Sequence, residues 1–528
     1  MKKLIAVFIL SLAFAPWGNA AQWQIMGTRA MGMGGAYVGV AEGPLTQYWN
    51  PAGLVKHDDD NYSGMTVPVG VNAEVTGKLA ANVGKAIDLA DKFKSLSKKI
   101  DQQAGAGNVN ADDFAALTKA LTILKDIAED ENKGILLDIN AGVGFKMSKV
   151  SFSINEFATA GFTPYIDEKN IGLGSTIGHG GSIEGVKIPT EARTAAVPAG
   201  YDSEATTLAN IIKDILDIDK LNNLLGLDGT GEKAPITTAQ ISNFANWLIQ
   251  QAKDSGMGKT DIDKAIGMIS ENAAPAAVII NNAVTGDDST SYKNNKSRLR
   301  GDVAAMTEIS AGYAWDIGPV PGLSVGTNLK MIDGMTLEYE IEFLKDGKKN
   351  DFDAKKDVQS TWRPAADLGV LWNIGQYTDK LPFPVRAGIV ARNINSPKFK
   401  YKHGGNYTYD RQIRAGVSTS PYPWWTISAD MDLTKNDTMI GDFYSRQVAL
   451  GMEFNVVHSL WFNLPLRIGL INNIAENDSK LAYTAGIGLH MLHFQLDVSA
   501  MMSSNTTEYQ DKKYPVHAGV AAQLSMLF

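Results

Sequence analysis

The stretch WWTISADMDL, residues 424–433, decides how this chain folds. In an extended backbone one face of it carries apolar side chains, namely Trp425, Ile427, Ala429, Met431 and Leu433. The opposite face carries Thr426, Ser428, Asp430 and Asp432. Alternation with a period of two residues predicts a β-strand with one apolar and one polar face. A tilted strand of about ten residues is long enough to cross a bilayer.

The same alternation recurs in other segments on both sides of this stretch. They lie near 62–75, 135–147, 149–159, 302–315, 322–340, 361–374, 384–394, 410–419, 424–434, 443–455, 464–473, 480–490, 492–503 and 514–527. This gives about 14 strands, and single-chain bacterial barrels have an even number. We therefore predict an all-β transmembrane barrel of antiparallel strands.

A soluble β-sandwich would show the same alternation, but two further features favour the barrel. Aromatic residues gather at strand ends, where a membrane barrel has its girdles; they are Trp372, Trp424, Trp425, Trp461 and Phe462. Charged residues also lie on the polar face, where a wet lumen accepts them and a dry sandwich core does not. These predicted lumen residues are Arg386, Asp430, Asp432 and Asp497.

The connections between the predicted strands support the same fold. If the chain enters from the periplasm, the periplasmic connections are short, such as Ser148–Lys149 and the sequence PYPW at 421–424. The connections assigned to the outside are longer, and they include 160–301 and the charged segment 341–360. Short inner turns and long outer loops are typical of these barrels.

The composition excludes several classes of protein. The 528 residues carry a formal charge of −8 and have a pI of about 5.5, whereas nucleic-acid binding needs a basic surface. The chain has no cysteine, so it has no disulfides, thiolate metal sites or cysteine nucleophiles. Absence of thiols also suits export through an oxidising periplasm.

The first 20 residues read as a signal peptide. Lys2 and Lys3 precede the apolar run LIAVFILSLAFA, and the small residues of GNA follow. This pattern predicts cleavage after Ala20, and the apolar run is too short for a spanning helix of about 20 residues. We therefore divide the chain into a signal peptide (1–20), an N-terminal hatch (21–61) and an outer-membrane barrel (62–528).

Two insertions, at about 77–133 and 160–301, follow a helical pattern instead. Segments such as TLANIIKDILDIDKLNNLL and ISNFANWLIQQAK have apolar residues at spacings of three and four, which predicts amphipathic helices. The order of the strands places both insertions at the extracellular mouth. The alternative is a separate helical domain in the periplasm, which would follow if the strand count were wrong by one.

No motif in the sequence predicts an enzyme, a metal site or another cofactor. The GMGG sequence at 32–35 lacks the Lys-Ser/Thr ending of a phosphate loop. The seven histidines form no ligand motif, and no Gly-x-Ser-x-Gly sequence is present. Asp430 and Asp432 resemble a carboxylate pair, but neighbours on one strand face usually line a solvated pore wall.

The segment GTRAMGMGGAYVGVAEGPLTQYWNPAGL, residues 27–54, precedes the first predicted strand. Its glycines allow close approaches that side chains would block. Its Asn50-Pro51-Ala52-Gly53 run predicts a rigid turn. A compact segment tethered to the first strand can fold back into a barrel lumen.

This segment resembles the N-terminal hatch of FadL-type outer-membrane proteins, the long-chain fatty-acid transporters. The similarity is greatest to the branch labelled conjugal transfer protein TraF-like, which shares the hatch motif and long insertions. The aromatic last residue, Phe528, is also usual in bacterial outer-membrane barrels.

The resemblance implies roles for particular residues. Asn50, Pro51 and Ala52 would anchor the hatch, and its core would contain Arg29, Gly34, Gly35 and Ala36. FadL-type proteins capture a hydrophobic molecule at the outer surface and release it sideways through a kinked strand. Asp333-Gly334 is the candidate kink here, because a glycine inside a strand often marks a bulge; ordinary strand curvature is the alternative.

Two functions remain open at this stage. The first is a hatch-gated outer-membrane channel for hydrophobic, fatty-acid-like molecules, with the apolar helix residues Ile211, Ile215, Leu216, Phe244 and Trp247 as a capture surface. The same residues could instead pack the helices together. The second is a structural or docking protein that binds a partner in conjugation, secretion or assembly through its helical insertions. Both imply contact with outer-membrane lipid, and neither involves nucleic acid.

Overall fold

The computed structural model describes residues 20–55, 62–77, 133–167, 194–216, 237–254, 257–271, 296–342, 357–376, 381–459, 461–509 and 512–528, with the single residues 79, 127, 128 and 130. The expected signal peptide and most of the first helical insertion lie outside these residues. No helix in the described part of the chain is both long and apolar enough to cross a membrane.

Fourteen antiparallel strands form a closed barrel, which confirms the predicted fold class. Each predicted strand is present with bounds shifted by a few residues. In chain order they are β2 (Gly64–Thr76), β3 (Gly134–Met147), β4 (Val150–Tyr165), β5 (Arg298–Asp316), β6 (Leu323–Glu342), β7 (Gln359–Asn373), β8 (Val385–Arg392), β11 (Gln412–Tyr422), β12 (Trp425–Asp432), β15 (Gln447–His458), β16 (Phe462–Asn473), β17 (Ala482–Met491), β18 (Phe494–Ser503) and β21 (His517–Leu527).

The first and last strands close the barrel. β2 pairs with β21 from Gly64–Leu527 to Glu74–His517, so the barrel has no free edge. Side chains alternate along each strand as predicted. In β12, for example, Ser428, Asp430 and Asp432 are buried inside, whereas the outward positions of β2 expose valines.

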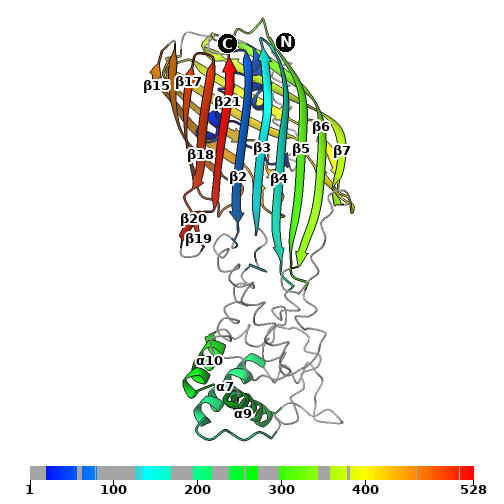
Figure 1. Ribbon diagram of the computed structural model, residues 1–528, viewed down its shortest axis with the longest axis vertical. Helices are drawn as coiled ribbons and strands as arrows, with labels where there is room; N and C mark the ends of the chain where they lie inside the picture. Colours follow the sequence, from blue (N-terminus) through cyan, green and yellow to red (C-terminus); the bar gives the residue numbers. More distant parts are fainter. Residues whose placement is uncertain are drawn as a thin grey trace.

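The two ends of the barrel differ. One end, which we call the turn end, carries the C-terminus and short connections such as Ser148–Lys149 (Figure 1). The other, the loop end, carries the long connections. Small hairpins lie within three of them, formed by β9 (Lys398–Lys400) with β10 (Asn406–Thr408), β13 (Asn436–Asp437) with β14 (Tyr444–Ser445), and β19 (Thr506–Tyr509) with β20 (Lys512–Pro515). This asymmetry agrees with the predicted order of turns and loops.

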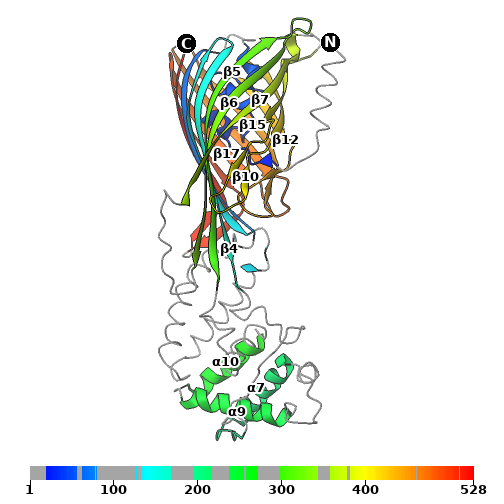
Figure 2. The same ribbon diagram turned by 90° about the vertical axis from the view of Figure 1, so that its right-hand side faces the viewer.

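Three of the predicted helices lie beyond the loop end in both views (Figures 1 and 2). They are α7 (Asp202–Leu216), α9 (Thr238–Asp254) and α10 (Lys259–Glu271). A capping box begins α9, because Thr237 and Gln240 each bond the other's backbone N–H, at 2.8 and 3.3 Å. The placement agrees with the predicted position at the mouth.

These helices bury their apolar faces against one another. Phe244 is 2% exposed, and Ile211 and Trp247 are partly buried beside the same small core. They therefore do not form the open capture surface considered above; they pack the helices together, which was the alternative. The side chains of Ile215 and Leu216 lie outside the described residues.

The hatch, residues 22–55, lies inside the barrel (Figure 2). It contains the short helices α2 (Thr28–Gly32) and α3 (Thr46–Trp49) and the 3-10 helix η1 (Pro51–Leu54). Within this range only Gln22, Arg29 and Glu42 are not fully buried. Just before it, β1 (Ala20–Ala21) pairs with β13 of a loop-end hairpin.

Candidate functional site

The Asn50-Pro51-Ala52 turn contacts the wall directly. The Asn50 side chain is buried, and its Oδ1 accepts a hydrogen bond from the Ala52 N–H at 3.2 Å, which caps η1. Its Nδ2 donates to the carbonyl oxygen of Val370 in β7 at 3.1 Å. One amide therefore both shapes the turn and bonds it to the barrel.

A pair of wall glycines makes room for this turn. Gly326 of β6 and Gly369 of β7 lie opposite each other in the ladder. A Cβ on Gly326 would overlap the backbone of Pro51 and Ala52, and a Cβ on Gly369 would overlap the Asn50 side chain. Here the backbones of hatch and wall touch, and only glycine permits this.

Two further glycine pairs receive other parts of the hatch. Gly451 and Gly469 lie opposite each other in β15 and β16, where a Cβ on either would overlap Met33 or Gly34. Gly388 and Gly416 pair between β8 and β11, and there a Cβ would lie 3.0 Å from the Val38 carbonyl oxygen or 2.9 Å from its Cβ.

The other hatch residues named from the sequence lie between these contacts. Gly34 and Gly35 have φ values of 69° and 91°, which disfavour any residue with a side chain. Ala36 is fully buried, and Arg29 reaches from α2 toward the turn end.

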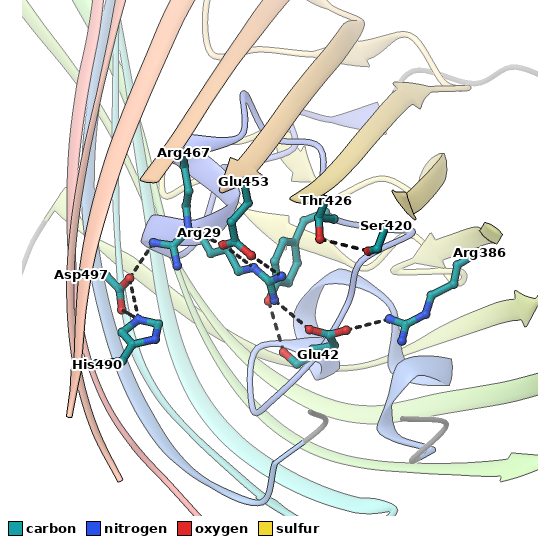
Figure 3. A network of polar contacts seen from close by, with 10 residues as sticks. Arg29, Glu42, Arg386, Ser420, Thr426, Glu453, Arg467, His490 and Asp497 are labelled. Carbon is teal, nitrogen blue, oxygen red and sulfur yellow. Dashed lines mark hydrogen bonds and ion pairs between the residues drawn. The ribbon is translucent and has the colours of Figure 1, made fainter. Parts of the chain in front are cut away.

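A chain of ion pairs crosses the turn-end side of the hatch (Figure 3). Arg386 of β8 binds Glu42 at 2.7 Å, and Glu42 binds Arg29 at 2.9 Å. Arg29 also binds Glu453 of β15 at 2.7 Å. Beyond this point the chain continues within the wall through Arg467, Asp497 and His490, with distances of 2.6, 2.6 and 3.1 Å.

A second charged layer lies toward the loop end. Arg414 pairs with Asp432 at 2.6 Å, and Arg392 pairs with Glu308 at 3.2 Å. Both guanidinium groups also contact hatch aromatics: Arg392 lies 4.0 Å from the ring centre of Tyr48, and Arg414 lies 4.8 Å from that of Trp23. The attraction between each guanidinium group and the face of the aromatic ring adds to the stabilisation that the carboxylate partner provides.

Two of the predicted lumen residues, Asp430 and Asp432, do not line a solvated pore. Asp430 Oδ2 accepts hydrogen bonds from the backbone N–H groups of Tyr37 and Val38, both at 2.8 Å. Asp432 is buried and pairs with Arg414, whereas Arg386 and Asp497 border a cavity that opens at the turn end. The expected solvated wall is therefore absent at Asp430 and Asp432, where the hatch and neighbouring side chains fill the lumen.

No β-bulge occurs at the candidate kink, Asp333-Gly334. β6 pairs without interruption with β5 and β7 through both residues. Gly334 instead makes room for the buried ring of Phe399 in β9, which a Cβ would overlap. A loop packed inside the barrel, and not a bulge, explains this glycine. Among the strand pairs, register shifts occur between β11 and β12 and between β15 and β16.

Two cavities border the hatch. A polar cavity of about 510 Å³ opens at the turn end, and we call it the vestibule. Its lining includes Glu42, Pro44, Arg386, Arg467 and Asp497. At the loop end a small chamber has about 20 Å³ of free volume. Its lining is Gln22, Gln24, Phe157, Thr159, Ala304, Met306, Tyr407, Tyr409, Asp437, Thr438 and Met439.

Shifted pKa values of Glu42 in the hatch and Tyr409 in a loop bear on the two cavities. Burial alone would raise the pKa of Glu42, but Arg29 and Arg386 lower it below its usual 4.5. Because the folded pKa is the lower one, these ion pairs stabilise the protein fully above pH 4.5, and the contribution is lost as pH falls through the lowered pKa. Burial raises the pKa of Tyr409 at the chamber, so its hydroxyl stays neutral.

The histidines do not form a metal site in the described structure. No group of three potential ligands lies together among the described residues. His490 contacts Asp497, whereas His493 Nδ1 lies 2.8 Å from the carbonyl oxygen of Leu527.

These observations define a class: a closed transmembrane barrel of 14 strands whose lumen is filled by its own N-terminal segment. Residues 47–432 match the family model described as F plasmid transfer operon, TraF, protein. The chain belongs to this family, which confirms the TraF-like relationship inferred from the hatch motif.

Solved structures with similar folds include barrel proteins from Pseudomonas. The toluene transporter TodX of Pseudomonas putida is 8% identical with a TM-score of 0.39, over 97% of this chain and 99% of that one. A Pseudomonas aeruginosa FadL homologue is 8% identical with a TM-score of 0.37, over 97% and 99%. No curated protein matches the sequence.

The sequence analysis missed the residues that hold the hatch. These are the six paired glycines, Glu42, Glu453, Arg467, Arg392 and Arg414. The sequence does carry a signal for the glycines, because each stands at an inward position of a predicted strand, between two outward-facing residues. Examples are LGV at 368–370 and LGM at 450–452. For the charges no local signal exists, because the partners lie on different strands or on the hatch, between 13 and 424 residues apart.

We expect Gly326→Ala to destabilise the protein by about 1–3 kcal/mol, because the new methyl group overlaps hatch backbone that cannot rotate away. The measurement is the free energy of unfolding in urea in detergent micelles. Gly144→Ala is the matched control, since a Cβ there lies 3.6 Å from its nearest neighbours, an ordinary contact. Equal stability of the two variants would contradict the role of the glycine pair.

We expect Glu453→Gln to cost about 3 kcal/mol or more, because it leaves the buried Arg467 and the partly buried Arg29 each short of one carboxylate. Asp316→Asn removes an exposed partner of Lys149 and should cost less than about 1 kcal/mol. The same unfolding experiment at pH 7 compares them. A loss no greater for Glu453→Gln than for Asp316→Asn would show that the chain of ion pairs does not hold the hatch.

Proposed function

We propose that this protein is an outer-membrane channel for hydrophobic, fatty-acid-like molecules, which its N-terminal hatch closes in the present conformation. The observation that carries the proposal is the chamber between the hatch and the loop-end hairpins. Its lining combines apolar side chains, among them Phe157 and Met306 from the wall and Met439 from the loops, with polar ones such as Gln24 and Thr159. Apolar side chains with a few convergent polar groups are typical of small-molecule sites.

The small free volume of the chamber fits a closed state. Tyr407 and Tyr409 stack with ring centres 6.3 Å apart and cover it from the loop side. Since both residues belong to the hairpin after β8, a shift of this hairpin would enlarge the chamber. The proposed order of events is binding in the chamber, movement of the hatch and passage to the vestibule.

The proposed location follows from the fold and the sequence together. Closed barrels with an apolar outer band span bacterial outer membranes. Removal of a signal peptide after Ala20 would leave a mature chain that begins at the hatch. In this orientation the turn end with its vestibule faces the periplasm, and the chamber faces the outside.

A fluorescent fatty-acid titration of the purified protein tests the proposal. We expect saturable binding, and we expect Ala304→Trp to weaken it at least about tenfold because the indole fills the chamber. Ala500→Trp, on the outward face of β18, is the control and should bind as the parent does. Absence of saturable binding, or equal binding by the two variants, would reject the chamber as the site.

A second candidate function is docking of a protein partner through the helices. It is favoured by their position beyond the barrel and by a core of their own that includes Ile212, Phe244 and Ile249 (Figure 1). The described residues of these helices do not line the chamber. Because the helices have a hydrophobic core of their own, they could bind a partner independently of the barrel.

Deletion of residues 203–283 separates the two functions. We expect the shortened barrel to bind fatty acid with unchanged affinity, because no described helix residue contributes to the chamber lining. Loss of a conjugation or secretion phenotype with binding intact would assign the helices to docking. Binding that weakens with the deletion would instead make them part of the capture route.

A further inference from the structure

Gln24 of the hatch carries a buried hydrogen-bond acceptor at the chamber. Its side chain is 8% exposed and belongs to the chamber lining, and its Oε1 has no hydrogen-bond partner among the described residues. The Oε1 of Gln22, in the same lining, is also buried without a described partner. Because an unpaired buried acceptor is unfavourable, both oxygens favour an occupant that donates a hydrogen bond.

The surroundings of Gln24 fix which way its amide points. Its Nε2 donates to the Thr159 hydroxyl at 2.8 Å, and to the Ala158 carbonyl oxygen and a carboxylate oxygen of Asp138 at 3.4 Å each. The carbonyl and the carboxylate only accept, so a rotated amide would turn its own oxygen toward two other acceptors. The group without a partner is therefore the oxygen and not the nitrogen.

The two threonines of the lining have no donor left for an occupant. The Thr159 hydroxyl donates to Asp138 at 2.6 Å, and the Thr438 hydroxyl donates to the carbonyl oxygen of Phe443 at 2.7 Å. The hydroxyl groups of Tyr407 and Tyr409 can donate as well as accept, so they suit either kind of occupant. The selection between head groups therefore falls to the glutamine oxygens and to the charge of the lining.

That charge is negative. Asp437 is the only charged residue in the described lining of the chamber. Arg392 lies 5.6 Å from the ring centre of Phe157, but its guanidinium is bonded to both carboxylate oxygens of Glu308. An anionic head group would meet a like charge in a site with few water molecules to screen it, and this is unfavourable.

The size of the chamber also limits the head group. Its free volume of about 20 Å³ holds one water-sized group, such as a hydroxyl or an ammonium group. Phe157 and Met306 of the lining suit the methylene groups that follow. The next hatch residues after Gln24, Ile25 and Met26, are buried and apolar, so they offer a polar head group no side-chain partner.

We propose that the chamber binds the end of an amphiphile that donates hydrogen bonds and carries no negative charge, as in a long-chain alcohol or an alkylammonium ion. This inference rests on the proposed function and narrows its substrate class. Gln24 accepts the hydrogen bond, and Asp437 attracts a positive charge. A fatty acid binds best in its protonated form, whose O–H donates, and its carboxylate binds more weakly.

Competition among four ligands with the same dodecyl chain tests the head group. Dodecanol, its methyl ether, dodecylamine and dodecanoate each compete with a fluorescent long-chain alcohol for the purified protein in an uncharged detergent at pH 8. At this pH the amine is protonated and the carboxylic acid is ionised. Each ligand is compared between protein variants, because its partition into micelles is then the same on both sides.

We expect Gln24→Met to weaken the binding of dodecanol about tenfold, because a thioether replaces the accepting oxygen, and to leave the methyl ether unchanged. Asp437→Asn removes the charge at constant size. It should weaken dodecylamine about tenfold, strengthen dodecanoate and leave dodecanol within about twofold. Asp442→Asn, at an exposed position between β13 and β14, is the matched control and should change none of them.

Unchanged binding of dodecanol by Gln24→Met would show that water and not the ligand satisfies this oxygen, and it would overturn the inference. Weaker binding of dodecanoate by Asp437→Asn than by the parent would overturn it as well. Either result would leave the proposed function in place. Absence of saturable binding by both the fluorescent alcohol and the fluorescent fatty acid would instead reject the proposed function, and the inference with it.

Discussion

Close contact between the hatch backbone and the wall backbone is the constraint on which the rest of this structure depends. A barrel of 14 strands encloses more space than inward side chains fill, so something else must occupy the lumen. Here the N-terminal segment does so, and glycines at the wall let it approach to van der Waals distance. Packing at this density leaves no layer of water between hatch and wall at these glycines.

The buried charges follow from the same arrangement. A charge inside a barrel costs several kcal/mol of desolvation, which only a well-placed partner offsets. The pairs Arg29–Glu453 and Glu42–Arg386 form only while the hatch is in position. Expulsion of the whole hatch would break both pairs together. This physical cost favours a local movement over displacement of the entire segment.

The sequence was sufficient for the barrel because strand alternation is a local property. The alternation of apolar and polar residues within each strand indicates which face meets lipid, and it can be read without knowing which strands lie beside it. The position of the helices followed from the strand count. The role of Asp430 could not be predicted, since the backbone N–H groups that it binds belong to the hatch, 393 residues away in the chain.

Gly334 shows that the position of a glycine inside a strand does not by itself predict a bulge. A glycine inside a strand has several physical causes, and the sequence does not say whether a bulge, a ring or a second backbone lies against it. At Gly334 the cause is Phe399, and at Gly326 it is Pro51. The repetition of glycine at inward positions of successive strands was the more informative pattern, because one bulge does not recur in neighbouring strands whereas a packed segment touches them all.

The charged residues that line the vestibule bear on what the channel would carry. A hydrocarbon without a polar group loses apolar contact when it leaves the chamber, and the arginines and carboxylates of the vestibule offer it nothing in return. An amphiphile keeps its chain along Ile25 and Met26 while its polar group enters the vestibule first. The bonds that this group forms there would offset part of the cost of moving the hatch. The proposed function therefore favours molecules with one polar end over uniformly apolar ones.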